Sequence, residues 1–155
     1  MEAGEHHKNL DTCTQVWHTL SELDADRKSL LINLGGGVVT DLGGFVASTF
    51  KRGISFINVP TSLLAMVDAS VGGKTGVDLG GLKNQVGIIN FPKMVLIDPL
   101  FLKSLPKYEI RSGVAEMLKH GLIKDAEYWK RLSDLKSLNL YDLECLIYES
   151  VVIKN

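Results

Sequence analysis

The chain has 155 residues, of which 45% are hydrophobic and 23% are charged, and its formal net charge is −1. This composition is typical of a globular protein of about one domain, and the near-neutral charge excludes a general attraction to nucleic acid or to an anionic membrane. No run of about 18 apolar residues is present to span a bilayer, and the polar start of the chain is unlike a signal peptide.

The first third of the chain is expected to alternate helices with one buried strand. Apolar residues recur at helical spacing over residues 11–23, where Asp11 is a suitable N-cap. Residues 29–34 form a short apolar run that stops abruptly at three glycines, which favours a buried parallel strand. Helical spacing then returns over residues 41–49.

The middle third contains further short elements and many of the glycines. Residues 54–59 alternate in polarity and end before Pro60, which predicts a second strand. A short helix is expected over residues 61–69 and a third strand over residues 94–97. Between these two, residues 70–90 are expected to be a glycine-rich, turn-prone stretch.

The last third has no glycine after Lys124, and helices are expected over residues 108–124 and 132–154. The repeated order of strand, glycine-rich turn and helix predicts an open, mostly parallel, Rossmann-like α/β sheet, followed by an all-α region. We place the domain boundary so that residues 1–104 form the α/β domain and residues 105–155 begin the helical one. Ligands of such sheets bind beyond the carboxyl ends of the strands.

The glycines at 35–37 follow an expected strand and open a helix. Backbone without a Cβ can approach a pyrophosphate closely, and the helix N-terminus supplies N–H groups and a favourable dipole. The motif is not GxGxxG, so a tight strand-to-helix turn without a ligand explains it equally well when it is taken alone.

The two cysteines belong to no motif. Cys13 and Cys145 lie far apart, which predicts reduced, partly buried thiols. Reduced thiols are usual in the cytoplasm, so we expect a cytoplasmic protein.

Three segments of the chain resemble the 3-dehydroquinate synthase family. They are LGGGVVTDLGGFVASTFKRG, VPTSLLAMVDASVGGKTGVDLGGLKNQVG and SGVAEMLKHG, in the family's order and spacing. The most discriminating part is VDASVGGKT followed by GGLKN. Iron-type alcohol and glycerol dehydrogenases share the fold and the glycine turn, but this lysine-rich segment is not expected in them. Cyclases that make inosose or valiolone from sugar phosphates are closer relatives and vary in the same stretch.

The resemblance implies a carbon–oxygen lyase of the shikimate pathway, which leads to aromatic amino acids. Its substrate would be 3-deoxy-D-arabino-heptulosonate 7-phosphate, and its products 3-dehydroquinate and phosphate. One site would oxidise an alcohol with NAD, eliminate phosphate, reduce the ketone, open the ring and close a carbocycle. Such chemistry requires lysines, asparagines, an arginine and a divalent metal, Zn²⁺ or Co²⁺, in one cleft. The resemblance also implies a homodimer, with no nucleic-acid or membrane partner.

The resemblance assigns NAD contacts to several parts of the α/β domain, including the glycine turn and the helix after it. Ser62 stands where the family more often has threonine, and it keeps a hydroxyl there. The NAD-binding set implied in this way is Glu5, Lys8, Gly36, Gly37, Val38, Asp41, Thr61, Ser62, Leu64, Lys83, Phe101 and Ser104.

For the substrate, the resemblance implies cationic and amide groups that hold a carboxylate and a phosphate. Arg52 matches an arginine that reaches the site of the neighbouring subunit, and Asp68 a carboxylate close to both cofactor and substrate. A lysine attracts phosphate as a point charge. The implied catalytic set is Arg52, Asp68, Lys74, Asn84, Lys119 and Lys154.

Glu116 is the one metal ligand that the resemblance identifies in this sequence. It lies three residues before Lys119, so the two share a helix face. In the family two later histidines complete a His₂Glu site of the catalytic zinc type. None of the four histidines here matches those positions, although His120 is close to Glu116. The first strands of the α/β domain are also missing. We therefore expect a truncated chain with little or no activity alone.

Three other functions remain possible readings of the sequence. A related sugar-phosphate cyclase would differ in its product. A non-catalytic module for NAD binding or dimerisation would bind the cofactor without turnover. A polyol dehydrogenase would release NADH and would leave the lysines unexplained.

Overall fold

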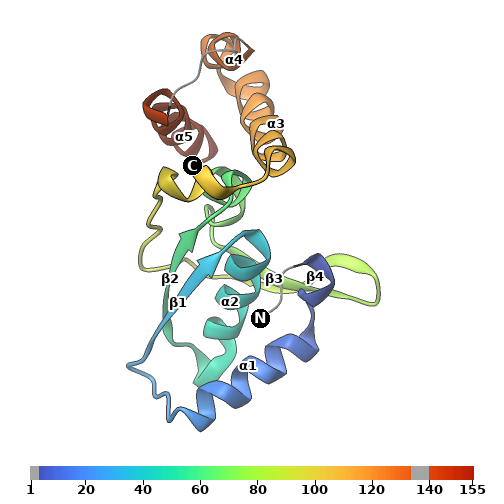
Figure 1. The fold of residues 1–155 in the computed structure, drawn as a ribbon. Coiled ribbons are helices and arrows are strands. Elements are labelled where there is room, and N and C mark those ends of the chain that lie inside the picture. Colours follow the sequence, from blue (N-terminus) through green and yellow to red (C-terminus); the bar gives the residue numbers. More distant parts are fainter. Residues whose placement is uncertain (1–3, 134–139) are drawn as a thin grey trace.

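The computed structural model describes residues 4–133 and 140–155. Helices α3, α4 and α5 lie together at one end, and two parallel strands, the helices α1 and α2, a hairpin and several short helices make up the rest (Figure 1). In chain order the elements are the 3-10 helix η1 (Glu5–His7), α1 (Leu10–Glu22), β1 (Leu30–Gly35), α2 (Gly37–Thr49), the 3-10 helix η2 (Phe50–Arg52), β2 (Ser55–Pro60), the π-helical segment η3 (Ala65–Ala69), β3 (Lys74–Leu79), β4 (Leu82–Ile89), the 3-10 helix η4 (Pro99–Ser104), α3 (Lys107–Lys124), α4 (Ala126–Ser133) and α5 (Leu140–Lys154).

Strands β1 and β2 pair in parallel, as expected, and their carboxyl ends meet at one edge of the sheet. At that edge the backbone N–H of Thr61 donates to the carbonyl oxygen of Gly35 over 2.9 Å. The strand expected over residues 94–97 is reduced to one parallel bridge between Asn58 and Val95. It stays short because Pro99 soon begins η4, with the Asp98 side chain accepting from the N–H of Leu100.

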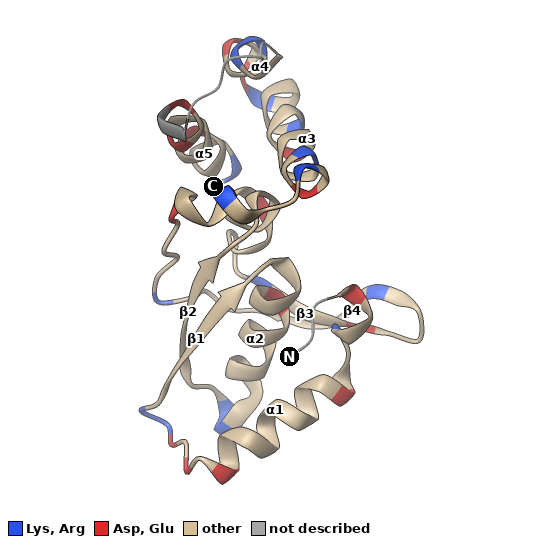
Figure 2. Ribbon diagram, in the orientation of Figure 1, with Lys and Arg blue, Asp and Glu red and all other residues tan. Residues whose placement is uncertain are grey.

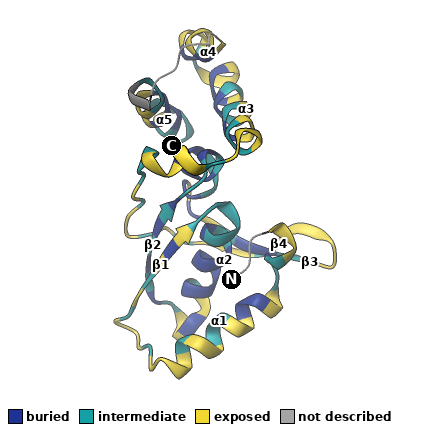
Figure 3. Cartoon of the chain, viewed as in Figure 1, coloured by how far each residue is buried: buried dark blue, intermediate teal, exposed yellow. Residues whose placement is uncertain are grey.

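The two faces of this parallel sheet differ in burial, and β1 carries exposed residues (Figure 3). Phe56 is buried, and Asn33 and Asn58 form a buried amide pair at 2.9 Å. On the other face of β1, Ile32 and Leu34 are 59% and 58% exposed. Parallel sheets usually have both faces covered, but this face of β1 is apolar and uncovered. The expectation that residues 29–34 form a buried strand is therefore corrected.

Helix α2 begins directly at Gly37, four residues earlier than expected, because the glycine turn itself supplies its first residues. Gly43 lies where this helix crosses β1. A Cβ there would come within 2.0 Å of Asn33 Oδ1, which belongs to the buried amide pair. Close packing is therefore the reason for a glycine in this helix, despite its cost of about 1 kcal/mol relative to alanine.

The expectation that residues 70–90 form a turn-prone stretch is wrong. Most of these residues form the antiparallel hairpin of β3 and β4. Gly80 and Gly81 make its two-residue turn, with φ angles of 57° and 82°. Positive φ at both central residues is what a two-residue hairpin turn of type I′ requires. Gly76 and Gly87 face each other in register, and a Cβ on Gly76 would lie 2.6 Å from the oxygen of Val86. Glycines therefore allow the two strands to approach each other closely, in addition to forming the turn.

The remaining expectations for helices hold with adjusted bounds. The short helix expected over residues 61–69 is present, and its last five residues are the π-helical η3. The side chain of Asn9, rather than Asp11, caps α1 by accepting from the N–H of Thr12 at 2.9 Å. Of the helix expected over residues 132–154, α5 covers 140–154 and α4 the first two residues, while 134–139 lie outside the described residues.

The helical end of the molecule has a core of its own that includes the segment around η3. Buried apolar residues before and within η3 pack against side chains of α3, α4 and α5, so these helices are fastened to the segment that carries Asp68. The cluster comprises Leu63, Met66, Val67, Leu102, Met117, Tyr128, Leu132, Leu146 and Ile147. Among the described helices, none is long and apolar enough to cross a membrane.

The two thiols should differ sharply in reactivity. Both cysteines are reduced, but Cys13 is fully buried and Cys145 is exposed, so the expectation that both are partly buried is corrected. Burial raises the pKa of Cys13 to about 11. Because the thiolate is the nucleophile, a disulfide reagent at pH 8 should modify one thiol per folded chain and the second only in denaturant. Rapid reaction of both thiols in the native chain would contradict this burial.

Candidate active site

A cleft of about 630 Å³ lies between η3, the β3–β4 hairpin and the end of α5. Figure 2 shows acidic and basic residues close together where the end of α5 meets η3. The cleft is lined by Asp41, Asp68, Ala69, Val71, Lys74, Thr75, Gly76, Asn84, Gln85, Gly87, Ile88, Ile89 and Lys154. The fold thus brings together five residues expected to bind cofactor or substrate, from segments far apart in the sequence.

One wall of the cleft is held by a buried lysine. Lys8 is 4% exposed, and its Nζ donates to Asp41 Oδ2 and to Asn84 Oδ1, each over 2.6 Å. Burial raises the pKa of Asp41, against the lowering effect of Lys8. Asn84 adopts a φ of 55° and donates its backbone N–H to Asp78 Oδ1. Lys8, expected at the NAD site, therefore connects α2 to the hairpin in this structure.

The opposite wall joins η3 to α5. The Lys154 ammonium donates to the carbonyl oxygen of Asp68 over 2.6 Å and also to its carboxylate. Lys74 lies on β3 and is exposed to the same cleft. Two lysines and the carboxylates of Asp41 and Asp68 therefore face a common space, which suits a substrate with anionic groups and hydroxyls.

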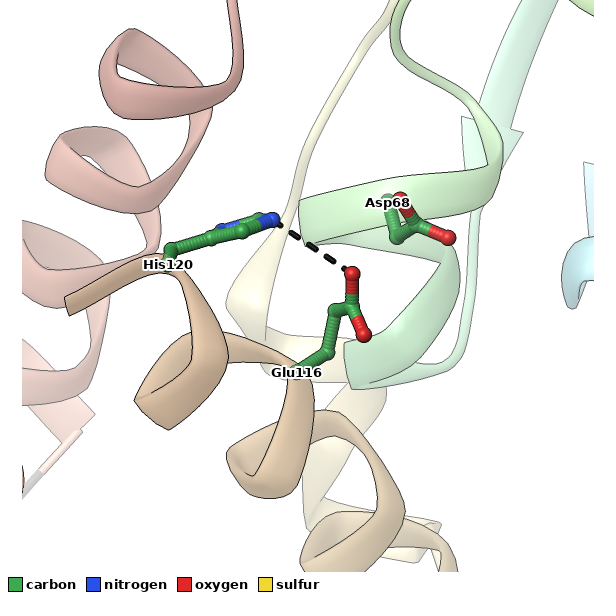
Figure 4. Close-up of side chains that lie close together, drawn as sticks. All are labelled: Asp68, Glu116 and His120. Atoms are coloured by element: carbon green, nitrogen blue, oxygen red, sulfur yellow. Dashed lines mark ion pairs between the residues drawn. The ribbon is translucent and has the colours of Figure 1, made fainter. Parts of the chain in front are cut away.

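Three potential metal ligands meet beside this cleft (Figure 4). Glu116 and His120 project from α3, and Asp68 projects from η3. One ligand atom from each residue lies within 4.8 Å of the others. The Lys119 ammonium also contacts Glu116, and this contact raises the pKa of Lys119. Among the described residues these are the three that could share one ion.

The imidazole of His120 is buried and has a polar neighbour at each nitrogen. Nδ1 lies 2.7 Å from Ser150 Oγ on α5, and Nε2 lies 3.5 Å from Glu116 Oε1. Burial lowers the pKa of His120. The sequence reading left His120 out of the ligand set, although its spacing of four residues from Glu116 on one helix was a usable signal.

The donor set fits the chemistry of a zinc or cobalt ion. Carboxylate oxygen and imidazole nitrogen are ordinary ligands of both metals. Helix α3 carries two of these ligands, and its close approach to the segment leading into η3 depends on Gly113. A Cβ at Gly113 would lie 2.5 Å from Leu63 Cγ and 2.8 Å from the backbone nitrogen of Leu64. Glycine at this position lets α3 pack directly on the segment that leads into η3.

The glycine turn lies at the carboxyl ends of β1 and β2, where ligands of parallel sheets bind. A Cβ on Gly36 would lie 3.3 Å from Ser62 Oγ, and one on Gly37 would lie 3.1 Å from the Cβ of Ala69. Ser62 in turn accepts from the N–H of Ala65 at 3.3 Å. The turn is therefore packed against the start of the segment that carries Asp68.

Other expected site residues lie apart from the cleft lining. Arg52 is exposed in η2, at the end of α2 opposite to the glycine turn. Glu5 and Lys83 form an exposed ion pair at 3.0 Å between η1 and the hairpin. Val38 is in the first turn of α2, and Leu64 directly precedes η3; Phe101 and Ser104 are exposed in η4.

Comparison with known proteins identifies the family. A family model described as the 3-dehydroquinate synthase N-terminal domain matches residues 1–112, well over half of the chain. The chain belongs to the 3-dehydroquinate synthase family. The open α/β fold with a helical region, expected from the sequence, is confirmed by the solved structures described below.

Curated relatives of this family member are similar along nearly its whole length. The 3-dehydroquinate synthase of Parabacteroides distasonis is 50% identical over 156 residues, which cover 99% of this chain and 44% of the relative. That of Prochlorococcus marinus is 50% identical over 155 residues, which cover 99% of this chain and 42% of the relative. The chain thus spans less than half the length of these relatives.

Solved structures of sugar-phosphate cyclases share the fold. A 2-epi-5-epi-valiolone synthase from Streptomyces hygroscopicus with NAD⁺ and Zn²⁺ bound is 31% identical, with a TM-score of 0.94 over 99% of this chain and 45% of that one. A 2-deoxy-scyllo-inosose synthase complexed with carbaglucose-6-phosphate, NAD⁺ and Co²⁺ is 31% identical, with a TM-score of 0.90 over 99% of this chain and 44% of that one.

Proposed function

We propose that the chain is part of a 3-dehydroquinate synthase, a phosphate-eliminating lyase that converts 3-deoxy-D-arabino-heptulosonate 7-phosphate to 3-dehydroquinate. One observation carries the proposal. Asp68, Lys74, Asn84 and Lys154 line a single cleft, and Glu116 lies beside it. Family membership of the chain supports the same reaction.

The glycine turn is the proposed pyrophosphate site for NAD. Gly36 and Gly37 present backbone N–H groups at the start of α2, where a phosphate can approach without meeting a Cβ. The proposed NAD set includes Val38, Asp41, Thr61, Ser62 and Leu64 around this turn. It is completed by the loop and helix residues Glu5, Lys8, Lys83, Phe101 and Ser104.

The substrate would lie in the cleft between η3 and the hairpin. Lys74, Lys119 and Lys154 offer charges for the phosphate and carboxylate, and Asn84 offers an amide. Asp68 can accept hydrogen bonds from substrate hydroxyls once Lys154 turns toward an anionic group. The lysines therefore serve to bind and orient the substrate, and Asp68 to hold a proton close to it.

Glu116 is proposed as the metal ligand supplied by this chain. When bound, NAD would supply reversible hydride transfer and Zn²⁺ or Co²⁺ a Lewis acid. The protein residues bind and orient the substrate in the cleft. We also propose that residues 1–104 and 105–155 belong to different domains, although the core around Met117 includes side chains from both.

Three further proposals concern assembly, location and activity. Arg52 lies outside the cleft of its own chain, so a homodimer in which it reaches the neighbouring site is proposed. A cytoplasmic location is proposed as well. We also propose little or no turnover by the 155-residue chain alone. The family's His₂Glu ligand set has no counterpart in His6, His7 or His18.

A related sugar-phosphate cyclase is the second candidate, and the likeness to solved cyclases with TM-scores of 0.94 and 0.90 favours it. Incubating a full-length protein that contains this segment with each sugar phosphate separates the two, because their carbocyclic products differ. Phosphate release with 3-dehydroquinate as the product is expected. Formation of an inosose or valiolone would overturn the main assignment.

The NAD site can be tested directly on this chain by calorimetric titration with NAD⁺. Saturable one-to-one binding is expected, with a severe loss of affinity in Gly36→Ala, because the added Cβ occupies the close-approach surface. Gly80→Asn is the control, since asparagine tolerates the positive φ of 57° at the hairpin tip and a Cβ there has no neighbour within 4 Å. Equal affinity of the wild type and Gly36→Ala would refute the turn as the NAD site. Saturable binding without turnover by the full-length protein would instead indicate a non-catalytic module.

A further inference from the structure

The segment η3, which carries Asp68, winds more widely than an α-helix. The backbone N–H of Ser70 donates over 3.0 Å to the carbonyl oxygen of Ala65, five residues earlier. In an α-helix this N–H would bond to the carbonyl of Met66, four residues earlier. The turn therefore holds one residue more than an α-helical turn. Such π-helical turns are rare and occur frequently at functional sites.

Ser70 closes this wide turn with its side chain as well as its backbone. Its hydroxyl donates to the same carbonyl oxygen of Ala65. Serine hydroxyls inside ordinary helices bond to the carbonyl four residues earlier, so a bond five residues back belongs to the π-helical form. Ser70 is 2% exposed, and solvent offers its hydroxyl no easy alternative partner. The hydroxyl therefore stabilises the wide turn against an α-helical one.

Successive residues of η3 face three different parts of the molecule. Met66 and Val67 are fully buried in the helical core. Asp68 lines the cleft (Figure 4). Ala69 lies against the glycine turn, where a Cβ on Gly37 would come within 3.1 Å of its own Cβ. Loss of the extra residue would rotate part of η3 by about 100°, the angle between neighbours in an α-helix. Asp68 could then not stay in the cleft while both of its neighbours keep their contacts.

Lys154 holds Asp68 by its backbone and by its side chain. The Lys154 ammonium donates over 2.6 Å to the carbonyl oxygen of Asp68 and also to the carboxylate. The same carbonyl oxygen accepts from the N–H of Val71 over 3.0 Å, directly after η3. A change in the winding of η3 would move the carbonyl and the carboxylate together. The contacts of Lys154 therefore report the conformation of η3.

We propose that Ser70 is a positioning residue for Asp68: its hydroxyl holds η3 in the π-helical form and so keeps the Asp68 carboxylate in the cleft. Because Ala69 of the same turn packs on Gly37, Ser70 also fixes the cleft relative to the glycine turn. The inference rests on the proposed function only for what Asp68 does to a substrate. The placement of Asp68 is a property of this chain and can be measured without substrate.

The test is competitive acetylation of the folded 155-residue chain with acetic anhydride, followed for each lysine by mass spectrometry. An amine must leave its hydrogen-bond partners before it reacts, so the acetylation rate of Lys154 shows whether Asp68 holds it. Ser70→Ala should raise this rate about two- to tenfold, the change that corresponds to losing one hydrogen bond of ordinary strength. Asp68→Ala removes the carboxylate outright and should raise the rate at least as much.

A rescue and two controls separate positioning from general loosening of the fold. Ser70→Thr keeps the hydroxyl and should return Lys154 to the wild-type rate; Ser70→Cys, with a weaker donor, should fall between if threonine is too large to fold. Ser112→Ala is the matched control, because the Ser112 hydroxyl donates to the carbonyl of Tyr108 over 3.1 Å in the ordinary helix α3. Lys130, paired with Glu127 on α4, is the internal reference and should react equally in all variants.

Several outcomes would overturn the inference. They are an unchanged Lys154 rate in folded Ser70→Ala, an equal rise at Lys130, the same rise in Ser112→Ala, or an unchanged Lys154 rate in Asp68→Ala. If the full-length protein makes another carbocycle while Lys154 reacts as expected, the proposed function fails and the positioning role of Ser70 stands. If 3-dehydroquinate forms and Ser70→Ala leaves Lys154 unchanged, only the positioning role fails.

Discussion

Replacing Lys8 by methionine is expected to lower the free energy of unfolding by about 3–5 kcal/mol, because removal of one partner leaves a poorly solvated charge. The ammonium is buried and serves both Asp41 and Asn84, each at 2.6 Å. Its loss removes the connection between α2 and the hairpin and leaves the Asp41 side chain, 20% exposed, without its cation. Urea denaturation measures the change.

Lys83→Met is the matched control for this prediction. Lys83 also pairs with a carboxylate, that of Glu5, but the two side chains are 70% and 44% exposed. Exposed pairs contribute about 0–1 kcal/mol, so the control should lose less than about 1 kcal/mol. Equal losses of unfolding free energy in the two variants would show that the large effect of Lys8 does not come from its burial.

Acidification should restore part of the stability of Lys8→Met. Burial already raises the pKa of Asp41 above its ordinary value of 3.8, and Lys8 opposes that rise. Without Lys8 the folded-state pKa rises further, so the folded chain binds this proton more tightly than the unfolded chain does. The contribution of the Asp41 carboxyl to the free energy of unfolding then falls as pH rises from 3.8 through its folded-state pKa. The difference in the free energy of unfolding between Lys8→Met and the wild type should therefore shrink as the pH is lowered through the folded-state pKa of Asp41.

Replacing Met117 by alanine is expected to cost about 2–5 kcal/mol, the range for truncating a large buried side chain. Met117 is fully buried in the helical core, where it belongs to the same cluster as Met66 and Val67. Truncation loosens α3 from the segment that carries Asp68. Thermal or urea denaturation should show the loss.

Leu122→Ala on the same helix is the control, because Leu122 is 71% exposed. Its replacement should change stability by less than about 0.5 kcal/mol, as is usual at the surface. A similar loss in both variants would mean that the effect reflects the helix itself and not the core.

The local sequence pattern was sufficient to predict most helices and strands of this protein. The apolar run at residues 29–34, the alternation at 54–59 and the glycines at 35–37 predicted two strands and a strand-to-helix turn that are present. The hairpin was missed because glycines usually mark turns. In Gly76 and Gly87 the same residue type permits two strands to approach closely, which only the pairing register reveals.

The resemblance of three segments was sufficient to predict the family and a list of candidate residues, because motif residues keep their spacing along the chain. Which of these residues meet was decided by the tertiary structure. Lys8 and Asn84 are 76 positions apart, and Asp68 and Lys154 are 86 apart, yet each pair is in hydrogen-bond contact. His120 became a candidate ligand for the same reason. Its spacing from Glu116 is local, but Asp68 and Ser150 reach it only through packing of η3 and α5 against α3, which periodicity along one segment cannot express.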